Sequence, residues 1–297
     1  MDRLDAMSVL LAVVEAGSLS AGARRLGAPL ASVSRKVADL EKHLGTQLVL
    51  RTSRRSELTE AGRAYAEAAK RILEQVDEAE RAAAGEYDEP RGELAVTAPV
   101  PFGRIHLVPV AVEFLAAHPN IDLRMMLTER NVNLVEEHIQ VAVRMGQLDD
   151  SALVSTRIGQ IRPVTCASPA YLERRGVPLM PEELGAHDCV TLTGFANLSG
   201  WTFKRGGAAV IVEPRSRFAV NTAEAAIAAA TAGLGVTRVQ SYQAAEALRS
   251  GALQPVLESF APEPVPVSLV YASQGLLPLK VRAFLDWSAP RLRARLA

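Results

Sequence analysis

The sequence predicts an α/β protein with an all-α N-terminal part. Apolar residues recur every three or four positions through most of residues 2–84, which is typical of helices. From Gly92 onward, short strand-like runs alternate with helical ones. This alternation indicates an open α/β sheet, which we expect to be mainly parallel. The length of 297 residues corresponds to about two domains.

Spacing and capping residues predict the first two helices. Residues 2–16 place apolar side chains at helical spacing, and Gly17 ends this helix. Ser18 is a good N-cap because its hydroxyl can accept a hydrogen bond from the first turn. A second helix is therefore expected over residues 19–26, ending at Gly27.

A third helix follows, and its two faces differ. Pro29 suits its first turn, where the missing N–H has no helical partner, and Gly45 ends it. The expected buried stripe is Val33, Val37, Leu40 and Leu44. The residues beside this stripe near the start of the helix are Ser32, Ser34, Arg35 and Lys36. Three short helices with polar and basic residues early in the last one are typical of a helix-turn-helix that enters the DNA major groove.

Basic residues are concentrated around this third helix. The chain has 33 Lys+Arg and 33 Asp+Glu. Residues 21–55 contain eight basic and two acidic residues, a net charge of +6, and the rest carries 25 basic against 31 acidic residues, a net charge of −6. One compact basic segment in a neutral protein indicates a local contact with a polyanion such as nucleic acid. The alternative is a solvated basic face.

A small hairpin and a long helix complete the N-terminal part. Residues 47–50 and 56–58 are expected to pair as a wing, with basic residues at its tip. Thr59 then caps a helix that runs to about residue 84. Its apolar residues form a seam close to a heptad repeat: Tyr65, Ala68, Ile72, Val76, Ala79 and Ala83.

The length of this helix favours a role in dimerisation. Some 25 residues span about 38 Å, more than the small preceding module can cover. The alternative is an amphipathic helix packed on its own domain. Residues 85–90 are expected to form a linker.

The C-terminal part predicts two α/β subdomains. Strands are expected over residues 92–99, 121–128, 141–146, 162–168, 189–192, 201–204, 209–213, 217–221, 235–239 and 266–273. Helices are expected over residues 102–117, 132–137, 222–232 and 241–249. The last strand would return to the first half, so crossing strands join two subdomains around a ligand cleft. This is a periplasmic-binding-protein-like architecture.

The run from Glu15 to Tyr65 resembles the winged helix-turn-helix of LysR-type transcriptional regulators. The matching pieces are Glu15-Ala16-Gly17-Ser18, Ala23-Arg24-Arg25-Leu26, Val33-Ser34-Arg35, Leu40-Glu41, Leu44-Gly45, Leu50-Arg51 and Leu58-Thr59-Glu60-Ala61-Gly62. Landmarks in the C-terminal part extend the resemblance over the whole chain, among them Val143-Arg144-Met145-Gly146 and Gly233-Leu234-Gly235-Val236. The resemblance implies a bacterial DNA-binding regulator whose DNA binding responds to a small molecule.

The resemblance also implies a division into three parts. These are a winged helix-turn-helix DNA-binding domain over residues 1–58, a dimerisation helix and linker over 59–90, and an effector-binding domain over 91–297. Dimerisation places two recognition helices on successive major grooves, so we expect an inverted-repeat promoter site in double-stranded DNA. Assembly into a tetramer is implied as well.

The expected DNA-binding residues come from the basic segment and the resemblance together. Ser34 and Arg35 match the family's groove-reading pair, and Arg51 and Arg54 match the wing. The full set is Ser18, Arg24, Arg25, Pro29, Leu30, Ser32, Ser34, Arg35, Lys36, Arg51, Arg54 and Arg55. For Ser34 the alternative is a helix-face hydroxyl, and for Arg35 a phosphate contact without base readout.

The expected effector-binding residues follow from the resemblance. They lie in loops after strands and near the second subdomain: Val100, Pro101, Phe102, Thr128, Glu129, Cys166, Phe195, Trp201, Asn221 and Thr222. Pro101 stands where a serine is common in the family, which removes one hydroxyl that could hold an anionic ligand at a helix N-terminus.

Several classes of protein are disfavoured. Neither a metal-ligand spacing among the five histidines nor a GxSxG, P-loop or GxGxxG motif occurs, so we expect no enzyme, metal or cofactor. Cys166 and Cys189 are expected to be free thiols in the core, with a redox sensor as the alternative. Apolar runs fall short of about 18 residues and the N-terminus is acidic, so we expect a cytoplasmic protein without a membrane partner. A solute receptor without DNA function is the competing hypothesis, but it leaves the basic N-terminal module unexplained.

Overall fold

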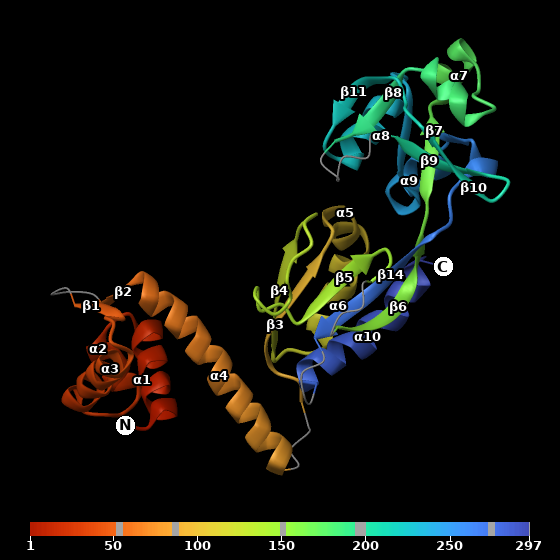
Figure 1. The fold of residues 1–297 in the computed structure, drawn as a ribbon. Helices are drawn as coiled ribbons and strands as arrows, with labels where there is room; N and C mark the ends of the chain where they lie inside the picture. Colours follow the sequence, from red (N-terminus) through yellow and green to blue (C-terminus); the bar gives the residue numbers. More distant parts are fainter. Residues whose placement is uncertain (52–55, 85–88, 149–152, 194–199, 273–276, 297) are drawn as a thin grey trace. The chain divides into compact units, whose positions relative to one another are not determined.

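The computed structural model describes residues 1–51, 56–84, 89–148, 153–193, 200–272 and 277–296. The chain divides into two compact units, an N-terminal unit, Met1–Glu89, and a C-terminal unit, Pro90–Ala297 (Figure 1). Each unit has its own hydrophobic core, so each is described separately.

The N-terminal unit contains the predicted helices, hairpin and long helix. Its elements are α1 (Arg3–Ala16), α2 (Leu19–Arg25), α3 (Leu30–Leu44), β1 (Val49–Arg51), β2 (Ser56–Leu58) and α4 (Glu60–Ala84). The stripe predicted for α3 is confirmed at Val33, Val37 and Leu40, which are at most 1% exposed. Leu44 was wrongly included, because it lies in the last turn of α3 and is 36% exposed.

Two glycines allow close backbone contacts in this unit. A Cβ atom at Gly22 of α2 would lie 2.8 Å from the Cα of Val13 in α1. A Cβ at Gly62, in the first turn of α4, would lie 2.0 Å from the carbonyl oxygen of Leu48. Both distances are below any normal van der Waals contact, so α1, α2 and the start of α4 can pack at these positions only around glycine.

The C-terminal unit contains two five-stranded sheets. The first has the order β4-β3-β5-β14-β6, and the second has the order β11-β8-β12-β7-β13. The strands of the first sheet are β3 (Gly92–Ala98), β4 (Ile121–Leu127), β5 (Val141–Met145), β6 (Leu153–Ile161) and β14 (Val265–Ala272). Those of the second are β7 (Pro163–Ala167), β8 (Cys189–Leu192), β11 (Ser216–Val220), β12 (Val236–Gln240) and β13 (Gln254–Val256). A separate hairpin consists of β9 (Trp201–Arg205) and β10 (Ala208–Val212).

Helices accompany each sheet. We call the sheet β4-β3-β5-β14-β6 with its helices the first half of the C-terminal unit, and the other sheet with its helices the second half. The first is packed by a continuous helical stretch made of α5 (Val100–Phe102), the π-turn η1 (Gly103–Leu107) and α6 (Val108–Ala117), and by α10 (Leu279–Leu296). The second is accompanied by α7 (Pro169–Arg175), η2 (Pro181–Gly185), α8 (Ala223–Thr231), α9 (Ser241–Arg249) and η3 (Glu258–Phe260). In the first sheet, β14 pairs with both β5 and β6. This pairing confirms the predicted return of the chain to the first half.

The structure corrects four expectations for the C-terminal unit. The sheets are mixed, since β14 is antiparallel to its neighbours and β7 pairs antiparallel with β12 and β13. The helix expected over 132–137 is a series of turns. The nine-residue β6 and the part of α10 before residue 291 were not predicted. The sequence favours only a frayed surface helix over residues 291–297, whereas residues 291–296 continue α10 and Leu292 there is fully buried in the core.

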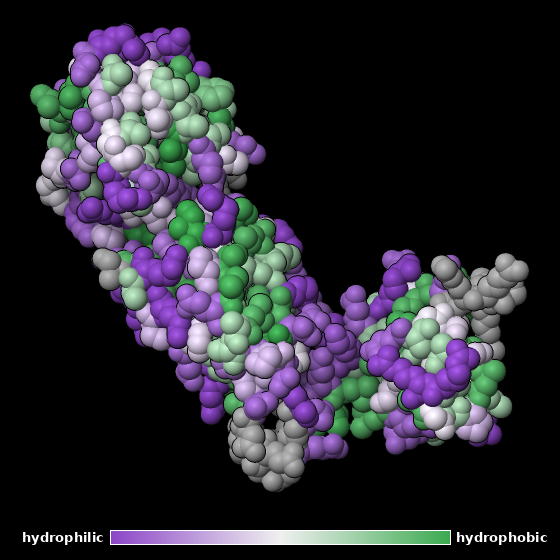
Figure 2. All heavy atoms as spheres, turned by 180° about the vertical axis from the view of Figure 1, so that it is seen from behind, coloured by the Kyte–Doolittle hydropathy of each residue, from purple (hydrophilic) through white to green (hydrophobic). Residues whose placement is uncertain are grey.

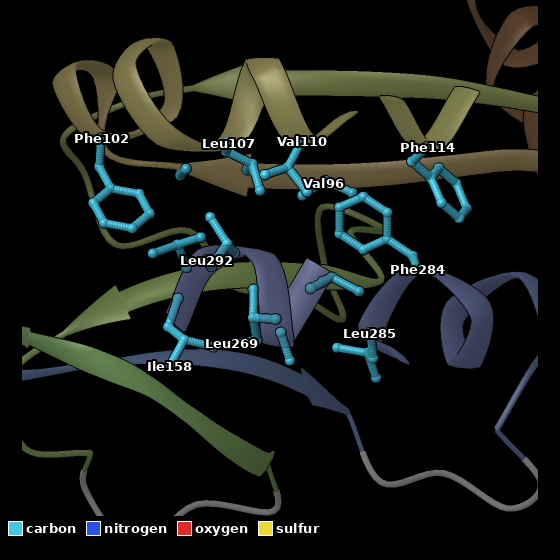
Figure 3. Close-up of a cluster of buried hydrophobic side chains, with 14 of the residues drawn as sticks. Val96, Phe102, Leu107, Val110, Phe114, Ile158, Leu269, Phe284, Leu285 and Leu292 are labelled. Carbon is cyan, nitrogen blue, oxygen red and sulfur yellow. The ribbon is translucent and has the colours of Figure 1, made fainter. Parts of the chain in front are cut away.

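The helical stretch Val100–Ala117 is unusually long and apolar because it packs in the core of the first half. Val100–Ala117 is long and apolar enough to span a membrane, which corrects the expectation that apolar runs fall short of this length. Among the described helices, α1 and α2 would also pass if they were counted together as one bent span. Here Leu107, Val110 and Phe114 of the long stretch pack with Phe284 and Leu292 of α10 (Figure 3). The stretch is therefore a core helix of this unit, with 44% of that window buried.

Apolar side chains also reach the surface of both units (Figure 2). In the N-terminal unit they include Leu50 at 44% and Ile72 at 39% exposure, and in the C-terminal unit Val112 at 62%. Single exposed apolar residues are ordinary. Those on one face of a long helix are more informative, because such a face is available to a second helix.

Candidate DNA interface and ligand cleft

The start of α3 is an exposed surface of the three-helix module. Leu30 is 48% exposed, Arg35 is exposed and Ser34 is half-buried, while Val33 and Val37 point into the core. Pro29 lies at the N-cap, one position before the expected first turn, and makes no side-chain capping bond. The first two turns of α3 therefore present polar and basic side chains on a helix anchored by its buried stripe, as groove reading requires.

The arginines and lysines around α3 differ in their partners. Lys36 pairs with Asp5 of α1 at 2.6 Å, and Arg25 pairs with Glu15 at 2.7 Å. Arg24 and Arg35 are exposed and make no ion pair within the described part of the chain. Their charges are thus the more available ones for a phosphate backbone.

The two other serines of the predicted set have local environments of their own. The Ser18 hydroxyl accepts a hydrogen bond from the Ala21 N–H at 3.1 Å, which caps α2. Ser32 is half-buried in the first turn of α3. Ser18 therefore has a structural task that is independent of DNA.

The wing is fixed to α3 through Glu41. One oxygen of its carboxylate accepts the N–H groups of Leu48 at 2.8 Å and Val49 at 3.0 Å, at the start of β1. The hairpin then pairs Val49 with Leu58 and Arg51 with Ser56. The expected tip residues Arg54 and Arg55 lie outside the described residues, and Arg51 is placed only by its backbone in β1.

The long helix α4 has one face on its own module and another in solvent. Ala66 and Ala69 are buried, with Ala69 fully so. Thr59 precedes the helix, and its hydroxyl accepts the N–H of Gly62 at 2.8 Å, as predicted for an N-cap. Of the predicted seam, Tyr65 packs against the core of this unit, whereas Ile72 is 39% exposed and remains available for another contact.

In the first half of the C-terminal unit, the expected ligand loops follow β3 and β4. Val100 is 41% exposed, and its N–H donates to the Glu129 carboxylate at 3.0 Å. Burial raises the pKa of Glu129, and Glu224 raises it further. Pro101 is buried and Phe102 is fully buried, whereas Thr128 is half-buried. The protein's own carboxylate thus already occupies the helix N-terminus at which an anion was considered.

In the second half, the expected residues lie where strands end or begin. Asn221 is exposed directly after β11, and the Thr222 hydroxyl caps α8 by accepting the Ala225 N–H at 3.3 Å. Trp201 is half-buried at the start of β9. Phe195 lies outside the described residues. Because β8, β11 and β12 run parallel, Asn221 and Thr222 lie at the same edge of the sheet as the end of β12.

Sequence reasoning missed the contacts between the two halves, which meet at the π-turn η1. Arg104 forms an ion pair with Glu224 of α8 at 2.9 Å. The ring of His106 lies 5.4 Å from that of Tyr242 in α9, and Phe102 lies 5.7 Å from the same ring. A π-turn often marks a functional site. The available signal was weak, because a single histidine among apolar residues usually indicates core packing.

His106 is buried without a hydrogen bond to either ring nitrogen. Burial, together with the nearby charge of Arg295, lowers the pKa of His106 to about 4. Burial also raises the pKa of Tyr242, and the negative charges of Glu129 and Glu224 act in the same direction. The His106–Tyr242 contact is thus uncharged at neutral pH, and it lies beside the Arg104–Glu224 ion pair.

The two cysteines are buried and free. Burial raises the pKa of each thiol to about 12. Cys166 in β7 and Cys189 in β8 lie on strands separated by β12, roughly 9–10 Å apart at a spacing of 4.7–4.9 Å per strand. A disulfide needs Cα atoms within about 7 Å, so these residues do not pair in this fold. Cys166 is fully buried and has no exposed surface for a ligand.

Residues that could ligate a metal are dispersed in the described part of the chain. Within the residues that the structure describes, His, Cys, Asp and Glu form no group of three or more that could hold an ion. The buried network around Tyr171, whose hydroxyl lies 3.2 Å from His187 Nδ1 and accepts the Asp188 N–H at 2.9 Å, ties α7 to β8. It lies inside the second half and has the character of a structural network.

Two family models match the chain. Residues 4–63 match the bacterial regulatory helix-turn-helix protein of the lysR family, and residues 87–293 match the LysR substrate binding domain. Together these segments cover α1 to the start of α4 and nearly all of the C-terminal unit.

Relatives and solved structures agree with these matches. The HTH-type transcriptional regulator YhjC of Escherichia coli is 34% identical, over 97% of both chains. The structure of CrgA, a LysR-type transcriptional regulator from Neisseria meningitidis, has a TM-score of 0.62 and 31% identity, covering 97% of this chain and 98% of that one. The full-length Vibrio cholerae virulence activator AphB has a TM-score of 0.62 and 25% identity, covering 99% of this chain and all of its own.

Proposed function

Because the chain belongs to the LysR family of bacterial transcriptional regulators, we propose that the exposed start of α3 reads a promoter site under the control of a small effector. As a LysR-type regulator, the protein has a helix-turn-helix DNA-binding domain and an effector-binding domain. The observation that carries the finer proposal is the exposed, unpaired Arg35 beside Ser34 on an α3 held by a fully buried stripe.

The proposed DNA contacts divide by role. Ser34 and Arg35 contact base edges in the major groove, since serine and arginine can both hydrogen-bond there. Arg24 contacts phosphate because it is exposed and lacks an ion pair among the described residues. Arg51, Arg54 and Arg55 extend the contact along the DNA backbone through the wing. Lys36 and Arg25 would have to exchange Asp5 and Glu15 for phosphate.

The proposed assembly is a dimer formed through α4. The seam residue Ile72 is exposed, and a helix of 25 residues extends beyond α1–α3 (Figure 1). Two-fold pairing of α4 presents two copies of α3, so the matching DNA site is an inverted repeat. Members of the family form oligomers, and a tetramer built from two such dimers is part of this proposal.

The proposed effector site lies between the loops after β3 and β4 and the ends of β8, β11 and β12. Val100, Thr128, Asn221 and Thr222 are at least partly exposed there and supply backbone and side-chain polar groups. A ligand that changes the Arg104–Glu224 and His106–Tyr242 contacts would shift the balance between arrangements of the two halves. That shift is the proposed link from effector to DNA binding.

A gel shift with DNA from upstream of the protein's own gene tests this function. We expect specific binding over a random competitor at two salt concentrations, with a strong salt dependence from phosphate contacts. Ser34→Ala and Arg35→Ala should both weaken specific binding. If no fragment is preferred, even in a genome-wide selection of bound DNA, the regulator proposal fails.

The same experiment separates the regulator from a solute receptor without DNA function. A receptor would bind a ligand in the C-terminal unit but would show no specific, salt-dependent DNA binding. We also propose that the protein acts without catalysis and in the cytoplasm, where its DNA target lies. The regulators among its relatives support this reading.

A further inference from the structure

Arg238 of β12 is a partly buried guanidinium without a carboxylate partner. Its Nη2 group donates to the backbone oxygen of Thr202 at 2.6 Å, and its guanidinium carbon lies 4.9 Å from the centre of the Phe203 ring. Within the described residues it takes part in no ion pair, and burial alone lowers its pKa to about 10. A neighbouring acid would have acted in the opposite direction.

An unpaired buried cation is costly to the fold. A guanidinium carries five N–H donors, and in the described part of the chain the only acceptor for Arg238 is the Thr202 carbonyl. Burial of a charge without a counter-charge destabilises the folded state, and a structural arginine is therefore usually paired. A destabilising unpaired charge of this kind is typical of binding sites that a ligand completes.

Thr202 and Phe203 contact the Arg238 side chain, and no acidic residue pairs with it in the part of the chain that the structure describes. On the same face of β12, two residues further on, the polar side chain of Gln240 caps α9 together with Gln243. Across the strand pair, Arg238 lies opposite Thr165 of β7. The hairpin that covers it begins with Trp201, directly before Thr202. This combination places the hydrogen-bond donors of Arg238 beside the aromatic side chain of Trp201.

The position of Arg238 connects it to the proposed effector site. It lies two residues before the carboxyl end of β12, and the parallel strand β8 beside it ends at the same edge of the sheet. Ligands of open α/β sheets bind at that edge. Arg238 is only partly buried, so its remaining donors are within reach of solvent there.

We propose that Arg238 binds the carboxylate of a small organic acid with an aromatic or otherwise apolar body. This inference rests on the proposed function and names the chemical class of its effector. The planar fork of arginine matches a carboxylate with two parallel hydrogen bonds, and the half-buried Trp201 provides apolar surface beside it.

Tryptophan fluorescence of the full-length protein tests the proposal with benzoate as the probe and benzamide as its uncharged counterpart. The chain has two tryptophans, so Trp287→Phe leaves Trp201 as the sole reporter near Arg238. We expect saturable quenching by benzoate and at least about tenfold weaker binding of benzamide, since a charge-assisted pair contributes about 1.5–3 kcal/mol. Arg238→Gln should weaken benzoate at least about tenfold, and Arg238→Lys should weaken it less because the charge remains.

Arg249→Gln is the matched control, because Arg249 is an exposed arginine of α9 that pairs with Glu246. It should leave benzoate binding unchanged. A readout without any ligand is the melting temperature of Arg238→Met, which keeps an apolar stem against Phe203 and removes the unpaired charge. We expect that melting temperature to equal or exceed the wild-type value, whereas a purely structural arginine would give a lower one.

Three results would overturn the proposal: no saturable benzoate binding to the wild type, equal benzoate affinity of wild type and Arg238→Gln, or a clear loss of melting temperature in Arg238→Met. The gel shift is scored separately. Specific DNA binding without a benzoate site would refute only the anion proposal. A benzoate site that depends on Arg238, without specific DNA binding, would refute the regulator proposal and leave the anion site in place.

Discussion

The Glu41 carboxylate of α3 accepts the backbone N–H of Leu48 at 2.8 Å, and this contact ties the recognition helix to the wing. Leu48 is fully buried, and its carbonyl oxygen accepts the N–H of Thr59 at 3.0 Å. The first turn of α4 packs on the same carbonyl through Gly62. One residue thus joins α3, the hairpin and the long helix, so these three elements are held in a fixed relation.

Glu41→Ala should loosen the wing. It removes an acceptor shared by Leu48 and Val49 and leaves two partly buried N–H groups unpaired, at a cost of about 1–3 kcal/mol to the N-terminal unit. We expect a lower melting temperature for this unit and weaker DNA binding by gel shift. Asp39→Ala on the exposed face of the same helix is the control and should change neither. An unaltered melting temperature in Glu41→Ala would show that water replaces the carboxylate without loss.

Gly62→Ala should destabilise the junction between the wing and α4. The added Cβ would lie 2.0 Å from the Leu48 carbonyl oxygen, and both groups belong to backbone that cannot move aside alone. Overpacking of this kind costs about 1–3 kcal/mol or more. Gly185→Ala is a suitable control, since a Cβ there meets no atom within 4 Å. Thermal unfolding followed by circular dichroism measures both, and equal stability of the two variants would contradict the close approach.

Arg35→Ala should reduce the salt dependence of DNA binding as well as its strength. If Arg35 reaches a phosphate, the slope of log K against log salt becomes less steep by about 0.9, and if it reaches only a base edge, specificity falls while the slope stays. Ser34→Ala removes no charge and should leave the slope unchanged. Lys42→Ala, near the other end of α3, is the control for a basic residue outside the proposed contact. Fluorescence anisotropy at four salt concentrations supplies the slopes. The assignment of Ser34 and Arg35 to specific DNA contacts is contradicted if the wild type and both α3 variants bind specific and random DNA with identical affinity.

His106 should make the C-terminal unit sensitive to mild acid. Its pKa in the folded state is about 4, below the ordinary value of 6.5, so the unfolded chain binds the proton first. The stability linked to neutral His106 is therefore present above pH 6.5 and is lost as the pH falls toward 4. His106→Phe keeps an aromatic ring beside Phe102 and Tyr242 but cannot titrate. We expect the melting temperature of His106→Phe to fall less than that of the wild type between pH 7 and pH 5. Equal decreases in the two proteins would show that another titrating group controls the loss of stability.

The parts that could be predicted from sequence are those that depend on local spacing. The stripe of Val33, Val37 and Leu40 follows from a 3.6-residue period, and the caps at Ser18 and Thr59 follow from hydroxyls before apolar runs. The long-range features could not be read in this way. The eighteen-residue α10 carries Pro290 in its interior, which hides it from a helix pattern.

The missed functional features depend on pairs that are distant in sequence. Tyr242 and His106 are brought together only by the crossing strands between the two halves. Arg238 looked like an ordinary strand residue, and its lack of an acid is visible only once its neighbours are placed. For the predicted ligand residues Phe102 and Cys166, sequence position suggests accessibility that the packing does not provide. They occupy loop and strand-end positions in sequence, but apolar neighbours bury both of them completely.

Ile72→Asp should weaken dimerisation without unfolding the chain. Ile72 is 39% exposed on α4, so a charge there costs the isolated N-terminal unit little, whereas in a helix pair the same carboxylate would be buried against its copy across the two-fold axis. We expect sedimentation velocity to show a shift from dimer or tetramer toward smaller species, with circular dichroism unchanged. Glu67→Lys, at an exposed position about 140° away around the same helix, should leave the assembly intact. DNA binding should fall in parallel with dimer content, because one α3 can occupy only half of an inverted repeat. If Ile72→Asp remains fully dimeric, α4 is not the main contact between subunits, and the spacing of the two recognition helices must be set elsewhere in the chain.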